Sequence, residues 1–396
     1  MNYDFTTVSK RFGIGSAKWD EIDKYLPNDK EDIVPFSVAD MEFRNPPEVK
    51  KALIDYIEKY PIGYVNVPNS YREAVCSWEE RRHDWKIKPE WIFTTPGIIS
   101  ALYDAVNTYT KPKEKVILMT PSYYPMYHAI EDTGRVIAEN KLIFENNRYT
   151  IDFDNFEKQA KDSKTTLFLM CNPHNPSSRV FTKEELMKIN KICLENNVFV
   201  CADEIHNDLI MKGYKHTVFA TLSEEASQNC MICVAASKTF NLAGCETSSI
   251  IIPNDDKRKM FIDYQHTGAL NPRANNLGLL ATETAYNEDE EWLKECLKVL
   301  EKNLSVINAY FEKELPQLKV IKTEGTYLVW MDFRAVKLDY KELGQILRVK
   351  GKMFFDDGYL FGKAGEKFER WNIACPTRYI EEALPRLKET LLPYLK

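Results

Sequence analysis

The chain has 396 residues, 44% of them hydrophobic and 28% charged, which is typical of a globular protein with about two domains. Its formal net charge is −6 and it has no basic tract, which argues against nucleic-acid binding. The nine cysteines are scattered and no apolar run approaches the ~20 residues of a membrane span, so we expect reduced thiols in a cytoplasmic protein that does not enter the membrane.

The middle of the chain alternates between helical and strand patterns. Helices are predicted over 98–108, 124–133 and 183–196, and the last of these begins at Thr182 with Glu185 three residues later, a capping box. Apolar runs that predict buried strands cover 115–119, 165–170, 198–201, 231–234 and 249–252. Strands that alternate with helices predict an α/β architecture with a largely parallel sheet.

The pattern changes at about residue 286. A long charged helix is predicted over 290–314, and the elements predicted after it are strands over 318–322 and 327–333, a helix over 340–350, a strand from 352 and a helix over 380–394. We therefore expect three parts: an N-terminal segment, 1–47, that packs with the small domain, a large domain, 48–285, and a smaller α+β domain, 286–396.

Polar side chains follow four of the predicted strands at their carboxyl ends. These groups are Pro121-Ser122-Tyr123, Asn172-Pro173-His174-Asn175, Asp203 to His206, and Ser237-Lys238. Ligands of open α/β sheets bind outside the carboxyl ends of the strands. We therefore expect these groups to converge on one crevice.

Lys238 and Asp203 each follow a buried strand, where a charged side chain needs a partner. One arrangement accounts for both residues. Lys238 would form a Schiff base with the aldehyde of pyridoxal phosphate (PLP), and Asp203 would pair with the protonated ring nitrogen of that cofactor. The plainer interpretations are a surface lysine and an Asp that caps a helix.

Four phrases resemble one known family: Thr95-Pro96-Gly97, Asn172-Pro173-His174-Asn175-Pro176, the run from Ser237 to Gly244, and the run from Glu324 to Leu328. The chain resembles the class I/II aminotransferases of fold type I, and within them the cystathionine β-lyase (C–S lyase) branch. The resemblance runs from Val38 to Pro376. It implies the fold-type I PLP-dependent transferase fold, with a mostly parallel sheet, helices on both of its faces and a smaller α+β domain.

The resemblance also implies roles around the cofactor ring. Lys238, once freed from the cofactor, would move protons at the substrate Cα, and Asp203 would keep the ring nitrogen protonated. Asn175 would donate to the 3′ oxygen, Tyr123 would stack on the ring, and His206 stands where many relatives have a tyrosine that contacts that oxygen. The last three also have structural interpretations, as a turn residue, a core aromatic and a buried histidine.

The phosphate and the substrate have their own implied residues. The phosphate would bind where Gly97, Ile98 and Ile99 open a helix, because a helix N-terminus attracts anions, and the Ser237 hydroxyl would add a donor. Tyr64 would reach the phosphate from the partner subunit of a homodimer with shared active sites. Arg370 would bind the substrate carboxylate through its two-pronged guanidinium, and its alternative is a surface arginine. The remaining substrate contacts would be Ala39, Asp40, Asn175 and Tyr359.

The chain departs from the common aminotransferase pattern in two places. Ser177 and Ser178 follow Asn175-Pro176, where Thr-Gly is common. The stretch 243–247 lacks the phosphate-binding arginine of many aminotransferases, as the lyase branch also tends to do, although Cys245 and Glu246 are less usual there. Arg273 is a candidate source of positive charge for the site.

Three functions remain open at this point. The first is β-elimination from cystathionine or another S-linked L-amino acid, which gives a thiol (homocysteine from cystathionine), pyruvate and ammonia. The second is transamination, which uses the same lysine, aspartate and arginine, and the third is a regulatory role as a PLP-binding partner protein. Elimination is favoured because the resemblance is closest to that branch. The six histidines show no metal-binding spacing, and no dinucleotide fingerprint follows a strand.

Overall fold

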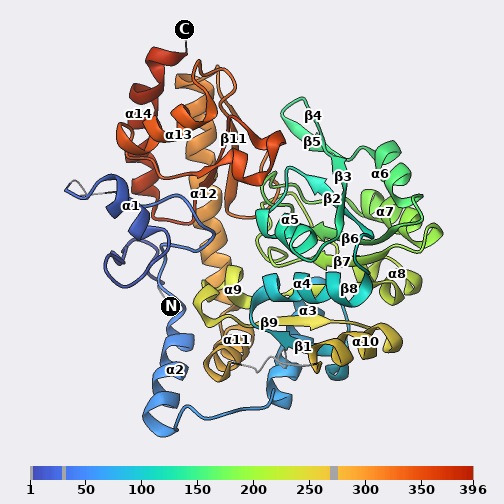
Figure 1. Ribbon diagram of the computed structural model, residues 1–396. Helices are drawn as coiled ribbons and strands as arrows, with labels where there is room; N and C mark the ends of the chain where they lie inside the picture. The colour runs from blue at the N-terminus through green and yellow to red at the C-terminus, as the bar shows by residue number, and fades with distance from the viewer. Residues whose placement is uncertain (1–2, 29–32, 268–274, 396) are drawn as a thin grey trace.

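The computed structural model describes residues 3–28, 33–267 and 275–395, which form two larger sheets and one small hairpin (Figure 1). Arg273, named above as a source of charge, lies outside these ranges. None of the helices within them is both long enough and apolar enough to cross a membrane. The small hairpin pairs β4 (Ile143–Glu145) with β5 (Arg148–Thr150).

The large sheet has seven strands in the order β1-β9-β8-β7-β6-β2-β3. Their bounds are β1 Ile92–Thr95, β9 Ser248–Ile251, β8 Cys230–Val234, β7 Phe199–Asp203, β6 Thr165–Cys171, β2 Lys115–Thr120 and β3 Val136–Lys141. The strands from β8 to β3 pair in parallel, and β9 is antiparallel to both of its neighbours. The predicted, largely parallel sheet is confirmed.

Both faces of this sheet are covered by helices, as expected for a parallel sheet. In β2, Val116 and Leu118 join one apolar cluster, and Ile117 and Met119 join the other. The first cluster includes residues of α4 (Gly97–Tyr109), α5 (Tyr124–Glu131) and α10 (Asp255–Gln265), and the second includes residues of α6 (Phe153–Ala160), α7 (Lys183–Glu195) and α8 (Glu224–Gln228). The predicted capping box of α7 is present.

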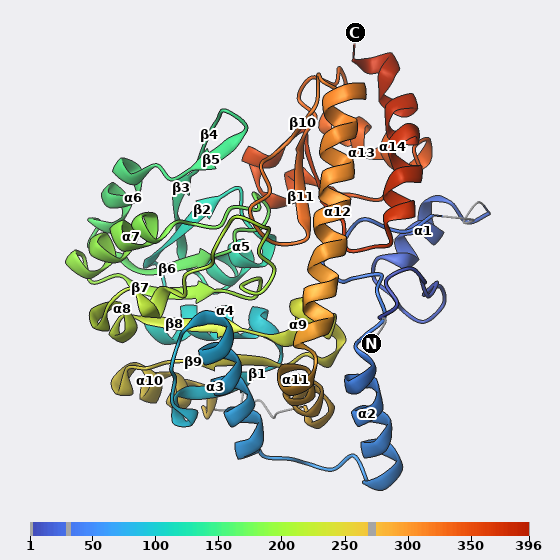
Figure 2. The same cartoon turned by 180° about the vertical axis from the view of Figure 1, so that it is seen from behind.

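The second sheet has four antiparallel strands in the order β10-β11-β13-β12. Their bounds are β10 Lys319–Val320, β11 Leu328–Asp332, β13 Phe368–Asn372 and β12 Asp356–Asp357. The long α12 (Glu290–Glu314) has the predicted bounds and lies beside this sheet with α13 (Tyr340–Val349) and α14 (Thr377–Leu391) (Figure 2). The strand predicted from 352 instead begins at Asp356, and the sequence reading missed β13.

The N-terminal part of the chain joins the two sheets. After α1 (Trp19–Tyr25), Phe36 donates its backbone N–H to the Phe354 carbonyl at 2.9 Å and accepts from the Asn372 N–H at 2.8 Å. The chain continues into α2 (Pro47–Lys59), which projects from the body of the molecule and packs on α11 (Asn276–Glu288), and then into α3 (Asn69–His83) (Figures 1 and 2). This path carries residues 38–40 past the carboxyl ends of the large sheet.

Candidate active site

Polar groups from four strand ends of the large sheet surround one cavity of about 210 Å³. The residues that line it and that the sequence had singled out are Ala39, Gly97, Ile98, Ile99, Tyr123, Asn175, Asp203, His206, Ser237 and Lys238. Because the parallel strands end at one edge, residues far apart in the chain meet here. The structure therefore brings together in one place the side chains that the motifs had selected separately.

Lys238 lies on the short helix α9 (Ala236–Thr239), which follows β8. Its Nζ donates to the backbone carbonyl of Ala39 at 2.7 Å. Burial of the amine, together with the nearby Arg370 guanidinium, lowers the pKa of Lys238 to about 8. The surroundings thus raise the fraction of neutral amine, which is the nucleophilic and basic form.

Asp203 and His206 present buried polar groups to the same cavity. Asp203 ends β7, is 3% exposed and accepts a hydrogen bond from the Ile205 N–H at 3.2 Å. Burial raises the pKa of Asp203 to about 7, and no cation of the described residues forms an ion pair with it. The Nδ1 atom of His206 is buried without a hydrogen-bond partner in the described part of the chain, and burial lowers the pKa of this imidazole.

The first turn of α4 forms another wall of the cavity. Gly97 begins this 13-residue helix with φ +75°, a left-handed conformation that favours glycine, and a Cβ built at this position would meet no atom within 4 Å. The adjacent N–H groups have no partners within the helix and carry its positive dipole end. This wall can therefore receive an anion beside the Ser237 hydroxyl.

Arg370 lies on β13, behind the wall formed by Asn175. It is 2% exposed, so the alternative of a surface arginine is wrong. Its Nη1 donates to Asn175 Oδ1 at 2.9 Å, its Nη2 donates to Asp356, and its guanidinium lies 4.7 Å from the ring centroid of Phe361. Tyr123 lines the cavity as well. Burial raises the pKa of its phenol, which therefore stays protonated.

Besides Arg370, three residues named from the resemblance do not line this cavity. Tyr64 is 91% exposed between α2 and α3, and Tyr359 is 37% exposed with its ring centroid 5.1 Å from that of Tyr340. The Asp40 carboxylate pairs with Arg11 at 2.9 Å and with Lys18 at 3.0 Å. Their expected contacts with phosphate or substrate stay predictions.

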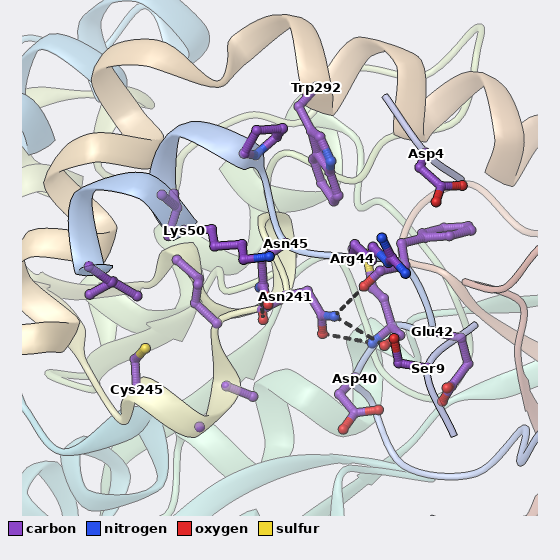
Figure 3. A pocket seen from close by; sticks show the side chains of 18 of the residues that line it. Asp4, Ser9, Asp40, Glu42, Arg44, Asn45, Lys50, Asn241, Cys245 and Trp292 are labelled. Carbon is purple, nitrogen blue, oxygen red and sulfur yellow. Dashed lines mark hydrogen bonds between the residues drawn. The ribbon is translucent and has the colours of Figure 1, made fainter. Parts of the chain in front are cut away.

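Asp40 lines a second, larger cavity of about 980 Å³ (Figure 3). This cavity lies between residues 3–11 and 40–57 on one side and the segment that follows Lys238 on the other, where Asn241 forms hydrogen bonds with the backbone of Met41 and Phe43 at 2.8–3.0 Å. Ala243 borders both cavities. The larger one contains neither Lys238 nor Asp203, so its size does not make it the reaction site.

Sequence reasoning missed several residues that shape the site. Tyr327 donates its hydroxyl to the Ala39 carbonyl at 2.9 Å, beside Lys238, and it stood in a quoted phrase without a role. Glu246, with φ +41°, and Thr247 line the cavity as well. Asp356 pairs with Arg370 because β12 and β13 align these two residues, a register that no local pattern indicates.

The model of the family described as aminotransferase class I and II matches residues 31–387. The chain belongs to this family. The described residues contain no cluster of three or more His, Cys, Asp or Glu side chains placed to hold a metal ion.

Similar members of this family are proteins named as lyases. The chain is 39% identical to cystathionine beta-lyase PatB of Bacillus subtilis (strain 168), over 99% of this chain and 100% of that protein. The crystal structure of cystalysin from Treponema denticola, which contains a pyridoxal 5′-phosphate cofactor, matches with a TM-score of 0.96 and 42% identity over 99% of this chain and 100% of that chain. The PLP-bound C–S lyase from Staphylococcus hominis matches with a TM-score of 0.90 and 28% identity over 99% of both chains. The expected fold-type I architecture is confirmed.

Proposed function

We propose that this chain is a PLP-dependent carbon–sulfur lyase of the cystathionine β-lyase type. It eliminates a thiol from Cβ of cystathionine or a related S-linked L-amino acid, and the other products are pyruvate and ammonia. One observation carries the proposal. The chain matches lyases over its full length, and its Lys238, Asp203 and Asn175 line one cavity.

Several groups in the cavity lack ion-pair or hydrogen-bond partners that PLP would supply. Asp203 is a buried carboxyl group that has no ion-pair partner among the described residues, and a protonated pyridine nitrogen would supply one. The buried Nδ1 of His206 has no hydrogen-bond partner in the part of the chain that the structure describes, and an oxygen substituent of the ring would supply one. The open space beside Gly97 lies at a helix N-terminus, which suits a phosphate. Lys238 would hold the cofactor covalently, and Tyr123 and Asn175 would fix its ring.

The bound cofactor supplies an electron sink for negative charge that develops at the substrate Cα. Asp203 would keep the proton on the ring nitrogen, so that this sink is effective. Lys238, once the substrate amine has displaced it from the cofactor, would take the Cα proton, which its lowered pKa allows near neutral pH. Arg370 and Asn175 orient the substrate carboxylate, and the thiolate then departs from Cβ. The amide oxygen of Asn175 already accepts from Arg370, so these two residues are positioned as a unit.

We also propose a homodimer with shared active sites, with Tyr64 reaching the phosphate of the partner subunit. The exposed apolar side chains of α2 support this, because Ile54 is 46% and Ile57 is 54% exposed. A cytoplasmic location agrees with the nine cysteines, all of which are free thiols. We also propose that the chain divides into parts 1–47, 48–285 and 286–396. This division places the seven-stranded sheet and the four-stranded sheet in separate domains.

The test is pyruvate release from L-cystathionine by purified, PLP-loaded protein without an added keto acid. Prompt pyruvate formation supports elimination, and the Lys238→Ala variant should lose both this activity and the cofactor's imine absorbance. If amino acids change the cofactor spectrum but no pyruvate forms, transamination replaces elimination as the function. Normal turnover by Lys238→Ala would contradict the whole site assignment.

A further inference from the structure

The guanidinium of Arg370 is already occupied by a carboxylate of the chain itself. Its Nη2 donates to Asp356 Oδ2, its Nη1 donates to Asn175, and its Nε is buried without a partner among the described residues. The side chains of Arg370 and Asp356 are 3% and 15% exposed. An ion pair this enclosed is weakly screened by solvent, so it competes with any other anion for the arginine.

The Asp356 carboxylate has a second donor in the same site. Its Oδ2 also accepts from the backbone N–H of Val38 at 3.0 Å. A guanidinium and a backbone N–H that converge on one carboxylate oxygen form an anion-recognition site. Two nearby acids are committed elsewhere, because Asp357 pairs with Arg348 at 2.8 Å and Asp40 pairs with Arg11 and Lys18.

This recognition site borders the cavity. Asn175 and Ala39 line the cavity, whereas Arg370 lies behind Asn175. Val38 has φ +51°, which is strained for a β-branched residue, and its carbonyl accepts from Asn372 at 2.7 Å. The next residue, Ala39, accepts from Lys238. Asp356 therefore ties the arginine to a strained segment that contacts the catalytic amine.

We propose that Asp356 is a specificity-determining residue that competes with the substrate carboxylate for Arg370 and for the Val38 N–H. This inference rests on the proposed function of Arg370. A substrate carboxylate takes the place of the Asp356 carboxylate, because two carboxylates on one guanidinium repel each other. Binding then requires a ligand carboxylate that displaces the Asp356 carboxylate from Arg370. A neutral analogue cannot displace it and therefore gains no binding energy from Arg370.

The test compares Asp356→Asn with the PLP-loaded wild-type protein. Asparagine keeps the shape and an acceptor oxygen but removes the competing charge. The dissociation constant of L-alanine, which has no leaving group at Cβ, is measured from the change in cofactor absorbance, and L-alaninamide serves as the probe without a carboxylate. Asp332→Asn is the matched control, since Asp332 pairs with Arg334 on the neighbouring strand of the same sheet.

We expect Asp356→Asn to bind L-alanine roughly threefold to tenfold more tightly, the range of one partly screened ion pair. Binding of L-alaninamide should not change, and Asp332→Asn should behave as wild type. Unchanged or weaker L-alanine binding by Asp356→Asn would overturn the inference. If wild-type protein binds L-alanine but forms no pyruvate from L-cystathionine, the lyase proposal fails while the L-alanine comparison still decides the role of Asp356. If L-alanine gives no spectral response at all, Arg370 is not a carboxylate site and this inference falls with it.

Discussion

At the scale of single residues, the surroundings of Lys238 prepare an amine for chemistry. With a pKa of about 8, about a quarter of the amine is neutral at pH 7.5, compared with about one part in a thousand at the ordinary value. We expect the rate at which cofactor-free protein forms its imine with PLP to rise with pH and level off above pH 8. Stopped-flow absorbance over pH 6–10 measures this rate. A rate that continues to rise towards pH 10.5 would contradict the lowered pKa.

At the scale of elements, the predictable and unpredictable parts of the fold differ in a physical way. The bounds of α12, the capping box of α7 and the positions of the polar residues at the strand ends could all be predicted from local sequence patterns. The strand β13 was missed because Glu369 and Arg370 interrupt its apolar pattern, although both are buried. The burial of Arg370 depends on Asp356 of β12 and on Asn175, and such cross-strand register is not written in any short segment.

Helix α3 contains a buried carboxylate whose titration should be visible in the stability of the protein. Glu79 is fully buried, neither oxygen has a hydrogen-bond partner among the described residues, and burial raises its pKa to about 7, although nearby His83 opposes this. The folded state thus holds the proton more tightly than the unfolded state. Its contribution to stability is present below pH 4.5 and is lost as the pH rises through 7.

We therefore expect Glu79→Gln to gain free energy of unfolding relative to wild type as the pH rises from 4.5 to 8, by about 3 kcal/mol at most. Urea unfolding at a series of pH values measures this difference. Glu80→Gln on the same helix is the control, because Glu80 is exposed and should show no such trend. A difference between Glu79→Gln and wild type that does not depend on pH would show that Glu79 does not titrate in this range.

At the scale of the whole molecule, α2 projects from the body (Figure 2). Its apolar side chains Ile54 and Ile57 are exposed. A proposed homodimer that buries this helix would also bring Tyr64 of the partner subunit to the phosphate. We expect Ile57→Asp to shift the protein towards monomers and to weaken PLP retention, because a buried unpaired charge opposes association. Light scattering and cofactor absorbance after gel filtration measure the two effects.

The matched control for Ile57→Asp is Met187→Asp on α7, a helix that lies well away from α2 in both views (Figures 1 and 2). Met187 is 51% exposed, close to the 54% of Ile57. The Met187→Asp substitution should leave the oligomeric state and the bound cofactor unchanged. If Ile57→Asp remains dimeric and retains PLP, α2 does not form the interface.

Residues 38–40 are anchored by residues that are synthesised much later. The Ala39 carbonyl accepts from Lys238, and Asn372 donates to the carbonyls of Val38 and Asp40, 334 and 332 residues earlier in the chain. The ribosome releases these partners at opposite ends of synthesis. A nascent chain that stops before β13 therefore leaves residues 38–40 without their anchor and Asn175 without Arg370. Capture of the cofactor in its final geometry must then be a late event, after nearly the whole polypeptide has emerged.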